Sequence, residues 1–276
     1  MAFVRNFKER YGAWAVVTGA SSGIGEQFAR LLAHEGLNLI LVARREEVLE
    51  SLAEELCAKH PVRVEALPLD LADPGFLSPL LDACAGKSVG LIVSNAGVAA
   101  KGEYIHMKPD ELSRLLDVNC RAPMLLANAF LPRLKKRGRG GFIFTGSLEG
   151  FQAYPFSVPY AATKAFVHSL GEGLWGEFEH TEVDVLVLAP GATDTELLAL
   201  SGMDPRDMPM GVMTAEAVAR VGLERLQIGP TAIAGWLNRL MTVMLSLMPR
   251  RWSILAGGKG MKDAMEKGLA RRRRGN

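Results

Sequence analysis

Short apolar runs alternate with longer amphipathic segments along most of this chain. The runs lie at residues 13–18, 38–43, 62–68, 89–94, 141–147, 182–188 and 231–234. Runs of this length are typical of strands buried on both faces of a parallel sheet. The segments between them carry apolar residues at helical spacing, as Ile24, Phe28 and Leu31 do before the stop at Gly36. The pattern predicts an α/β fold, a doubly wound parallel sheet of about seven strands with helices on both faces.

The same periodicity gives the expected helices. They cover residues 24–36, 48–60, 74–85, 110–117, 119–136 and 214–227, together with one long helix that follows residue 147. Thr214 is the expected N-cap of the helix at 214–227 because its hydroxyl can accept a backbone N–H. No low-complexity linker or internal repeat separates these elements. Residues 1–235 are therefore expected to form one domain.

The C-terminal segment, residues 236–276, has a different pattern. Trp236 to Met248 form an apolar helical stripe that is too short to span a bilayer. Residues 250–276 carry nine Lys or Arg and two acidic residues, although the net charge of the whole chain is only +2. We expect an amphipathic helix and a basic tail, which form a C-terminal helical extension. Two interpretations stay open, packing on the body or on a second subunit, and peripheral contact with anionic lipid.

Composition narrows the class of protein. The 276 residues are 49% hydrophobic and 22% charged, which suits one large soluble domain with a substantial core. Cys57, Cys84 and Cys120 are widely spaced, so neither a disulfide framework nor a zinc site is predicted, and a reducing cytoplasm fits best. The five histidines lack metal-ligand spacing. We expect no metal site, no nucleic-acid-binding domain and no signal peptide.

A glycine-rich turn follows the first apolar run and precedes a helix. It reads Gly19-Ala20-Ser21-Ser22-Gly23-Ile24-Gly25. Glycines let the backbone approach a pyrophosphate closely, and the free N–H groups at a helix start favour an anion. In the order strand, glycine loop and helix, this turn predicts a dinucleotide site in a Rossmann-type fold.

Two arginines at the end of the second apolar run bear on the choice of nucleotide. Many NAD sites have an acidic residue there for the ribose hydroxyls, whereas this chain has Arg44 and Arg45. An arginine pairs well with the 2′-phosphate of NADP, so NADP(H) is the predicted cofactor. The alternative is that one of the two, Arg45 in particular, is a solvated residue at a helix start.

Strand ends bring further polar and small residues to the same rim of the sheet. Asn119 lies in an otherwise apolar stretch, where an amide needs partners. Tyr160 and Lys164 are four residues apart and share one helix face, where the cation would lower the pKa of the phenol. Alone, such a pair also fits a packed tyrosine beside a solvated lysine. The strand-end candidates are Asp70, Leu71, Asn95, Ala96, Gly97, Ser147, Pro190 and Gly191.

Taken together, these residues resemble the classical short-chain dehydrogenase/reductase family over about residues 13–200. One departure is Ser94, where the family often has asparagine. The C-terminal extension and the sequence around the active-site residue Tyr160 look like those of the branch of 3-ketoacyl reductases and 17-beta-hydroxysteroid dehydrogenases. The resemblance implies a ketoreductase of lipid metabolism that forms a homo-dimer or homo-tetramer. It rests on Thr18 to Gly25, Asp70, Asn95-Ala96-Gly97, Asn119, Ser147, Tyr160-x-x-x-Lys164 and Pro190-Gly191.

The resemblance also implies a role for each site residue. Ser147 would donate a hydrogen bond to the substrate carbonyl, and Tyr160 would be the general acid and base. Lys164 would lower the pKa of Tyr160 and bind the nicotinamide ribose, and Asn119 would hold a water of the proton relay. On the cofactor, the resemblance places Arg44 with Ser21 at the 2′-phosphate, Asp70 near the adenine and Thr193 by the carboxamide.

The substrate is expected to be an apolar ketone or alcohol. The segment after Pro190-Gly191, residues 192–213, is rich in methionine and leucine, which suits an apolar substrate but equally suits ordinary packing. Residues 151–158 are apolar as well. Two alternatives differ in function, an NADPH-binding regulator without turnover and a dehydrogenase of a small hydroxy acid. Arg206 is the candidate partner of such an acid.

Overall fold

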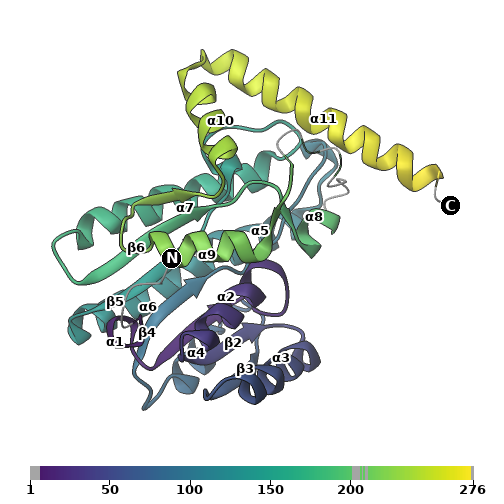
Figure 1. The fold of residues 1–276 in the computed structure, drawn as a ribbon. Coiled ribbons are helices and arrows are strands. Elements are labelled where there is room, and N and C mark those ends of the chain that lie inside the picture. Colours follow the sequence, from purple (N-terminus) through teal and green to yellow (C-terminus); the bar gives the residue numbers. More distant parts are fainter. Residues whose placement is uncertain (1–6, 201–205, 207, 209–210, 275–276) are drawn as a thin grey trace.

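Seven parallel strands form one central sheet in the computed structural model, which describes residues 7–200, 206, 208 and 211–274. Their order is β3-β2-β1-β4-β5-β6-β9, so the chain winds outward in both directions from β1 (Figure 1). The predicted fold class is confirmed. The strands are β1 (Trp14–Thr18), β2 (Asn38–Ala43), β3 (Val64–Pro68), β4 (Val89–Ser94), β5 (Gly140–Thr145), β6 (Val183–Ala189) and β9 (Thr231–Ile233).

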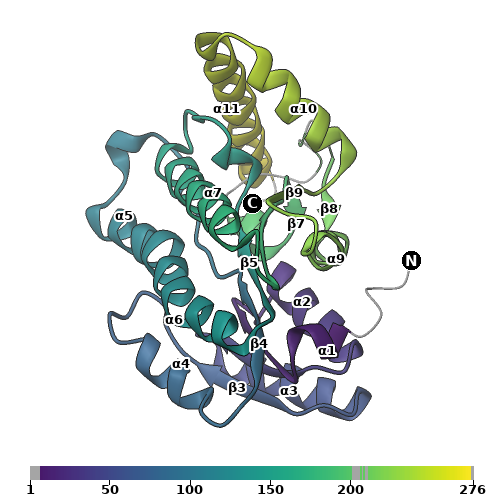
Figure 2. The ribbon, with the colours of Figure 1, turned by 90° about the vertical axis from the view of Figure 1, so that its left-hand side faces the viewer.

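Helices cover both faces of the sheet (Figure 2). Successive strand residues point to opposite faces, so Val17 packs in the core with α2 and α9, whereas Val16 packs in the core with α6 and α7. This period-2 alternation makes strand sequences that are buried on both faces almost entirely apolar. The helices are α2 (Gly23–His34), α3 (Glu46–Lys59), α4 (Leu77–Ala83), α5 (Pro109–Leu116), α6 (Ala122–Arg137), α7 (Val158–Phe178) and α9 (Ala215–Arg225).

Several local features differ from the sequence pattern. β5 ends at Thr145, two residues before the expected end, and Ser147 instead caps the 3-10 turn η3 (Leu148–Gly150) by accepting the Glu149 N–H. A short helix, α1 (Phe7–Tyr11), was not expected. A π-helical turn, η2 (Asp117–Arg121), joins α5 to α6. Thr214 does cap α9, with its hydroxyl accepting the Ala217 N–H, as predicted.

Beyond Asp194 the chain forms smaller elements and then two helices. β7 (Thr193–Asp194) pairs with β8 (Met213–Thr214), and α8 (Glu196–Leu200) lies between them in sequence. The expected helix after residue 235 is α10 (Trp236–Leu247). The following segment, expected as a basic tail, is instead the helix α11 (Arg250–Arg274). Alanine, leucine, methionine, lysine and arginine favour a helix there, and no proline follows Pro249.

α10 and α11 lie together at the margin of the molecule, beyond the rim formed by the strand ends (Figure 1). No helix among the described residues is both long enough and apolar enough to cross a membrane. The division of the chain at residue 235 and the oligomeric state stay predictions.

The packing of α1 against β4 leaves no room for a side chain at Gly90. A Cβ at this position would lie 2.0 Å from the Tyr11 carbonyl oxygen. Tyr11 cannot move away easily because it is fully buried and its hydroxyl donates to Asp184 Oδ2 at 2.8 Å. The backbone of α1 is therefore held directly against the strand.

We expect Gly90→Ala to lower the free energy of unfolding by about 1–3 kcal/mol, because the backbone must shift to accept the methyl group. The matched control is Gly173→Ala in α7, where the added Cβ meets no atom within 4 Å. That control should stabilise the protein by up to about 1 kcal/mol, since alanine favours a helix over glycine. Urea unfolding measures both changes. Equal stabilities for the two variants would contradict this account of α1.

Candidate active site

The glycine-rich loop makes a tight turn between β1 and α2. Gly19 has φ of +67°, a backbone conformation that disfavours side chains. A Cβ on Gly25 would lie 2.2 Å from the Gly19 carbonyl oxygen, so only glycine fits there. The loop therefore presents backbone N–H groups at the start of α2, where the helix dipole favours an anion.

Asn95 joins the ends of the three central strands. Its Nδ2 donates to the Thr18 carbonyl at 3.1 Å, and its Oδ1 accepts the Thr145 hydroxyl at 3.3 Å. The Thr18 hydroxyl accepts the N–H groups of Asn95 and Ala96 at 2.9 and 3.1 Å. These bonds fix the ends of β1, β4 and β5 at the point where the direction of strand order reverses, the usual ligand site of such a sheet.

A single cavity of about 710 Å³ runs along this rim and is lined by nearly all predicted site residues. Gly25 and Asn119 are the two predicted residues that do not line it. Both support its wall from behind. The predicted residues that line the cavity are Gly19, Ser21, Ser22, Gly23, Ile24, Arg44, Asp70, Leu71, Asn95, Ala96, Gly97, Ser147, Tyr160, Lys164, Pro190, Gly191 and Thr193.

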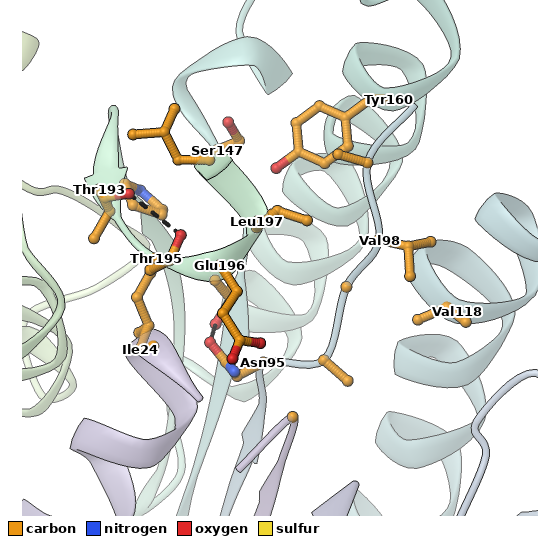
Figure 3. Close-up of a pocket in the computed structure, with 18 of the residues that line it drawn as sticks. Ile24, Asn95, Val98, Val118, Ser147, Tyr160, Thr193, Thr195, Glu196 and Leu197 are labelled. Atoms are coloured by element: carbon orange, nitrogen blue, oxygen red, sulfur yellow. Dashed lines mark hydrogen bonds between the residues drawn. The ribbon is translucent and has the colours of Figure 1, made fainter. Parts of the chain in front are cut away.

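Ser147 and Tyr160 lie near each other in the cavity wall, one just after β5 and the other in α7 (Figure 3). Both side chains are largely buried. Lys164 lies one helical turn after Tyr160, with its Nζ 5.7 Å from the centre of the Tyr160 ring. The same Nζ donates to the Thr145 carbonyl at 2.8 Å. A hydroxyl, a phenol and an ammonium group thus meet where a carbonyl oxygen can be bound and protonated.

Asn119 clamps the loop after β4 to helix α7. Its Nδ2 donates to the Val98 carbonyl at 2.9 Å and to the Thr163 hydroxyl at 3.1 Å, and its Oδ1 accepts the Val98 N–H at 2.9 Å. These bonds supply the partners that a buried amide requires. Asn119 lies in the π-helical turn η2, a form of helix that often occurs at functional sites.

A family model described as short chain dehydrogenase matches residues 13–204. The chain belongs to the short-chain dehydrogenase family. A 7beta-hydroxysteroid dehydrogenase from Clostridium sardiniense is 36% identical over 235 residues, which is 85% of this chain and 90% of that protein. The family predicted from the sequence is therefore confirmed, and the chain is an oxidoreductase of this family.

Solved structures agree with this assignment. A 7beta-hydroxysteroid dehydrogenase structure superposes with a TM-score of 0.86 and 26% identity, covering 92% of this chain and 99% of that one. A short-chain dehydrogenase from Sphingobium yanoikuyae, in complex with NADPH, has a TM-score of 0.76 and 31% identity, covering 86% of this chain and 96% of that one. The short-chain dehydrogenase fold thus extends over most of the chain.

The pKa of Tyr160 lies above the usual value of a tyrosine, which differs from the expectation that Lys164 lowers it. Burial is the largest cause, because it disfavours the charged phenolate, and the negative charge of Glu149 raises the pKa further. A hydrogen bond with Ser147 acts in the opposite direction. Burial also lowers the pKa of Lys164 to about 8, although Cys120 and Glu149 oppose this shift. The phenol is therefore protonated at neutral pH in this site.

Lys101 and Glu149 form an ion pair beside Tyr160 that the sequence pattern did not indicate. Lys101 Nζ lies 2.5 and 2.7 Å from the two Glu149 carboxylate oxygens and 4.7 Å from the centre of the Tyr160 ring. Ser157 hydrogen-bonds to both members of the pair. The Lys101 side chain is only 6% exposed. Because both charges line the cavity, the pair limits the net charge that Glu149 places next to the phenol.

Arg45, not Arg44, is the arginine that contacts the glycine loop. Its Nη2 donates to the Ser21 hydroxyl at 3.0 Å, and its Nη1 donates to Glu196 at 2.9 Å. Arg45 is the half-exposed residue at the start of α3, and it also makes these contacts. The placement of Arg44 with Ser21 at a 2′-phosphate stays a prediction. Both arginines line the cavity. A dinucleotide phosphate fits this end of the cavity, where two guanidinium groups, Ser21 and the start of α2 all supply donors.

Asp70 has a partner that sequence inspection missed. Arg114 Nη2 donates to both Asp70 carboxylate oxygens, at 3.0 and 2.9 Å. Burial acts to raise the pKa of Asp70, but the Ala72 N–H and Arg114 outweigh it, so the pKa falls below its usual value. The two residues are more than 40 positions apart, which is why no local motif reveals the pair.

His168 supports Ser147 from behind and was treated as an ordinary histidine from the sequence. Its Nε2 accepts the Ser147 N–H at 3.4 Å, and the ring stacks edge-on against Phe151 with centroids 4.4 Å apart. A Cβ on Gly146 would lie 2.5 Å from His168 Nε2, so the histidine fills the space that this glycine leaves. Burial lowers the pKa of His168 to about 4, so the ring is neutral at physiological pH.

Apolar side chains line another part of the same cavity. The segment after Gly191 contributes Leu197, Leu198 and Met208, and Met261 reaches the cavity from α11. Of the expected flap residues, Met203 and Met210 lie outside the described residues. Arg206, the candidate partner of a substrate carboxylate, is exposed and does not line the cavity. This apolar lining therefore suits an apolar substrate.

The neutral state of His168 predicts a pH-dependent stability. An unfolded histidine binds a proton below about pH 6.5, whereas folded His168 does so only near pH 4. The protein should therefore lose stability as the pH falls through this window, by about 2 kcal/mol between pH 7 and 4.5 from this residue. His168→Gln keeps an acceptor for the Ser147 N–H but does not titrate. In urea unfolding, its stability should fall less than that of the wild type.

The control for this prediction is His180→Gln, because His180 is exposed. We expect it to follow the wild type at both pH values. If His168→Gln and the wild type lost the same stability on acidification, the neutral buried state of His168 would be wrong.

Proposed function

We propose that this protein is an NADP-dependent oxidoreductase that interconverts a ketone and a secondary alcohol on a bulky apolar substrate. One observation carries the proposal. Ser147, Tyr160 and Lys164 line a single cavity together with the phosphate donors of the glycine loop and the apolar side chains of the segment after Gly191. A cofactor on the phosphate donors and a substrate on the apolar side chains would share this cavity with the hydroxyl pair.

The binding role rests on residues of the glycine loop and the strand ends. The start of α2 would hold the pyrophosphate. Arg45 and Arg44, together with Ser21, would bind the 2′-phosphate, and Asp70 would lie near the adenine. Pro190, Gly191 and Thr193 would hold the nicotinamide end. When bound, the nicotinamide ring supplies or accepts the hydride.

The chemical role rests on Ser147 and Tyr160. The Ser147 hydroxyl donates a hydrogen bond to the substrate oxygen, which stabilises negative charge there as the carbonyl is reduced. The Tyr160 hydroxyl gives its proton to that oxygen, and the resulting phenolate takes a proton back from solvent. In the oxidation of an alcohol the same proton moves in the opposite direction. Lys164 supplies positive charge near the phenolate. Asn119 holds the loop after β4 against α7.

The surroundings of Tyr160 favour reduction near neutral pH. Burial and Glu149 raise the pKa of Tyr160, so the phenol holds the proton that reduction requires. Oxidation needs the phenolate and therefore becomes faster as the pH rises. Because the pKa of Lys164 is about 8, its side chain loses the ammonium charge as the pH rises above that value.

The proposed substrate is lipid-like, of the steroid or long-chain ketoacyl class. The apolar side chains that line the cavity support this class, as does the similarity to a 7beta-hydroxysteroid dehydrogenase. A small hydroxy acid fits less well, because Arg206 does not line the cavity and Lys101 is already paired with Glu149.

We expect Tyr160→Phe to abolish turnover, with a rate loss of about a hundredfold or more, because the variant lacks the proton donor. Binding of NADPH, followed by its fluorescence, should be unchanged. The measurement is NADPH absorbance against ketones that range from short keto acids to long acyl and steroid ketones. Tyr154→Phe is the matched control, since it removes a phenol from the same cavity but not the proposed acid. Tight NADPH binding without turnover of any ketone or alcohol would favour the regulator instead.

A second prediction concerns nucleotide preference. Arg45→Ala should weaken NADPH binding by roughly tenfold or more and leave NADH binding nearly unchanged, because it removes charge-assisted hydrogen bonds to the 2′-phosphate. Glu196→Gln should tighten NADPH binding, since Glu196 competes for the same guanidinium. Fluorescence titration measures both affinities. Arg139→Ala is the control. Arg139 is exposed and lies just before the amino end of β5, away from the rim formed by the carboxyl ends of the strands. Equal losses for NADPH and NADH would contradict the prediction.

A further inference from the structure

Helix α10 presents its apolar side chains to solvent rather than to the body of the protein. Exposed apolar residues recur along it at spacings of three and four, as from Trp236 to Leu240 and from Leu240 to Val243 and Met244, so they form one stripe along the helix. Trp236 at one end is 73% exposed, and Leu247 at the other is 81% exposed. The stripe, called the α10 stripe below, consists of Trp236, Leu237, Leu240, Val243, Met244 and Leu247.

The opposite side of α10 is held against the active-site rim by a buried amide. Asn238 is buried, and its Nδ2 donates to the Ala234 carbonyl at 2.6 Å. A Cβ on Gly191 would lie 2.5 Å from the same Nδ2, so Asn238 is wedged against the turn that lines the cavity. The Thr242 hydroxyl donates to the Asn238 carbonyl at 2.9 Å. Because Asn238 is buried against this turn, α10 cannot roll to bury its stripe without displacing that side chain.

The α10 stripe lies in a part of the chain that carries only positive charge. No aspartate or glutamate occurs between Glu224 and Asp263. Trp252 and Leu255 of α11 extend the apolar surface, being 63% and 55% exposed. α10 and the start of α11 lie at the outer edge of the molecule in both ribbon views (Figures 1 and 2). The exposed basic residues of this stretch are Arg239, Arg250, Arg251, Lys259 and Lys262.

We propose that the α10 stripe and these five basic residues form a docking surface for a membrane that contains anionic phospholipid. An exposed apolar stripe, tryptophans and flanking cations are what an interfacial helix needs to enter the headgroup region. A two-fold dimer would bring this surface against its own copy. The arginines would then meet each other with no carboxylate of the surface to pair them, which disfavours a second copy as the occupant.

The docking surface lies beside the active-site cavity. A second cavity, of about 360 Å³, lies between α10, the start of α11 and the loop after η3. It shares Leu148 and Tyr154 with the main cavity, and Met241 and Leu245 of α10 line it. A docked protein would therefore receive an apolar substrate directly from the lipid. This last consequence rests on the proposed function, whereas docking itself does not.

The test is flotation of the full chain with lipid vesicles, without substrate or cofactor. Vesicles of phosphatidylcholine alone are compared with vesicles containing phosphatidylglycerol, at low and high salt. We expect at least roughly tenfold more protein on the anionic vesicles at low salt and a loss of binding at high salt. A triple variant, Trp236→Ser with Leu240→Ser and Leu247→Ser, should lose binding. A charge variant, Arg250→Gln with Arg251→Gln, should weaken it by roughly tenfold or more.

The matched control replaces three exposed apolar residues elsewhere, Tyr104→Ser with Ile105→Ser and Ile228→Ser, and should bind like the wild type. NADPH binding and the far-ultraviolet circular dichroism of each variant check that it is folded. The proposal is overturned if the wild type does not float with anionic vesicles, or if the triple variant floats equally well. It is also overturned if analytical ultracentrifugation shows that the wild type is a dimer and the triple variant a monomer, while the wild type does not bind vesicles.

Discussion

The hydrogen bonds of Asn95 are the constraint on which the rest of the site depends. They hold the ends of β1, β4 and β5 together, and through Thr18 they set where the glycine loop begins. A Cβ on Gly25 would lie 2.6 Å from Asn95 Nδ2, so the loop and the amide require each other. The glycine loop and the region around Ser147 and Tyr160 are therefore fixed relative to each other. Backbone and amide contacts form the framework of both regions.

The electrostatics of the site centre on one buried phenol with three charged neighbours. Lys164 and Lys101 place positive charge 5.7 and 4.7 Å from the Tyr160 ring centre, and Glu149 places negative charge beside it. Burial strengthens each of these effects, because a low dielectric screens charge poorly. The position of the proton on Tyr160 thus depends on a balance among groups that come from three separate segments of the chain.

The fold and the centre of the site could be predicted from the sequence because their signals are local. The glycine loop and the Tyr160–Lys164 spacing each lie within a few residues, and seven apolar runs sufficed to indicate the sheet. Lys101, Arg114 and His168 could not be predicted, since their partners are 21 to 48 residues away. Such pairings follow from packing that no short pattern encodes. The raised pKa of Tyr160 was missed as well, because burial and the charge of Glu149 raise it and neither can be read from the Tyr160–Lys164 spacing.

The most direct test of the central claim follows a deuterium label. NADPH that carries deuterium at the transferable position of its nicotinamide ring is incubated with the protein and a series of bulky apolar ketones. The products are then analysed by mass spectrometry. The account predicts an alcohol with deuterium on the former carbonyl carbon. Tight binding of NADPH without labelled alcohol from any ketone, and without oxidation of the matching alcohols by NADP⁺, would contradict it.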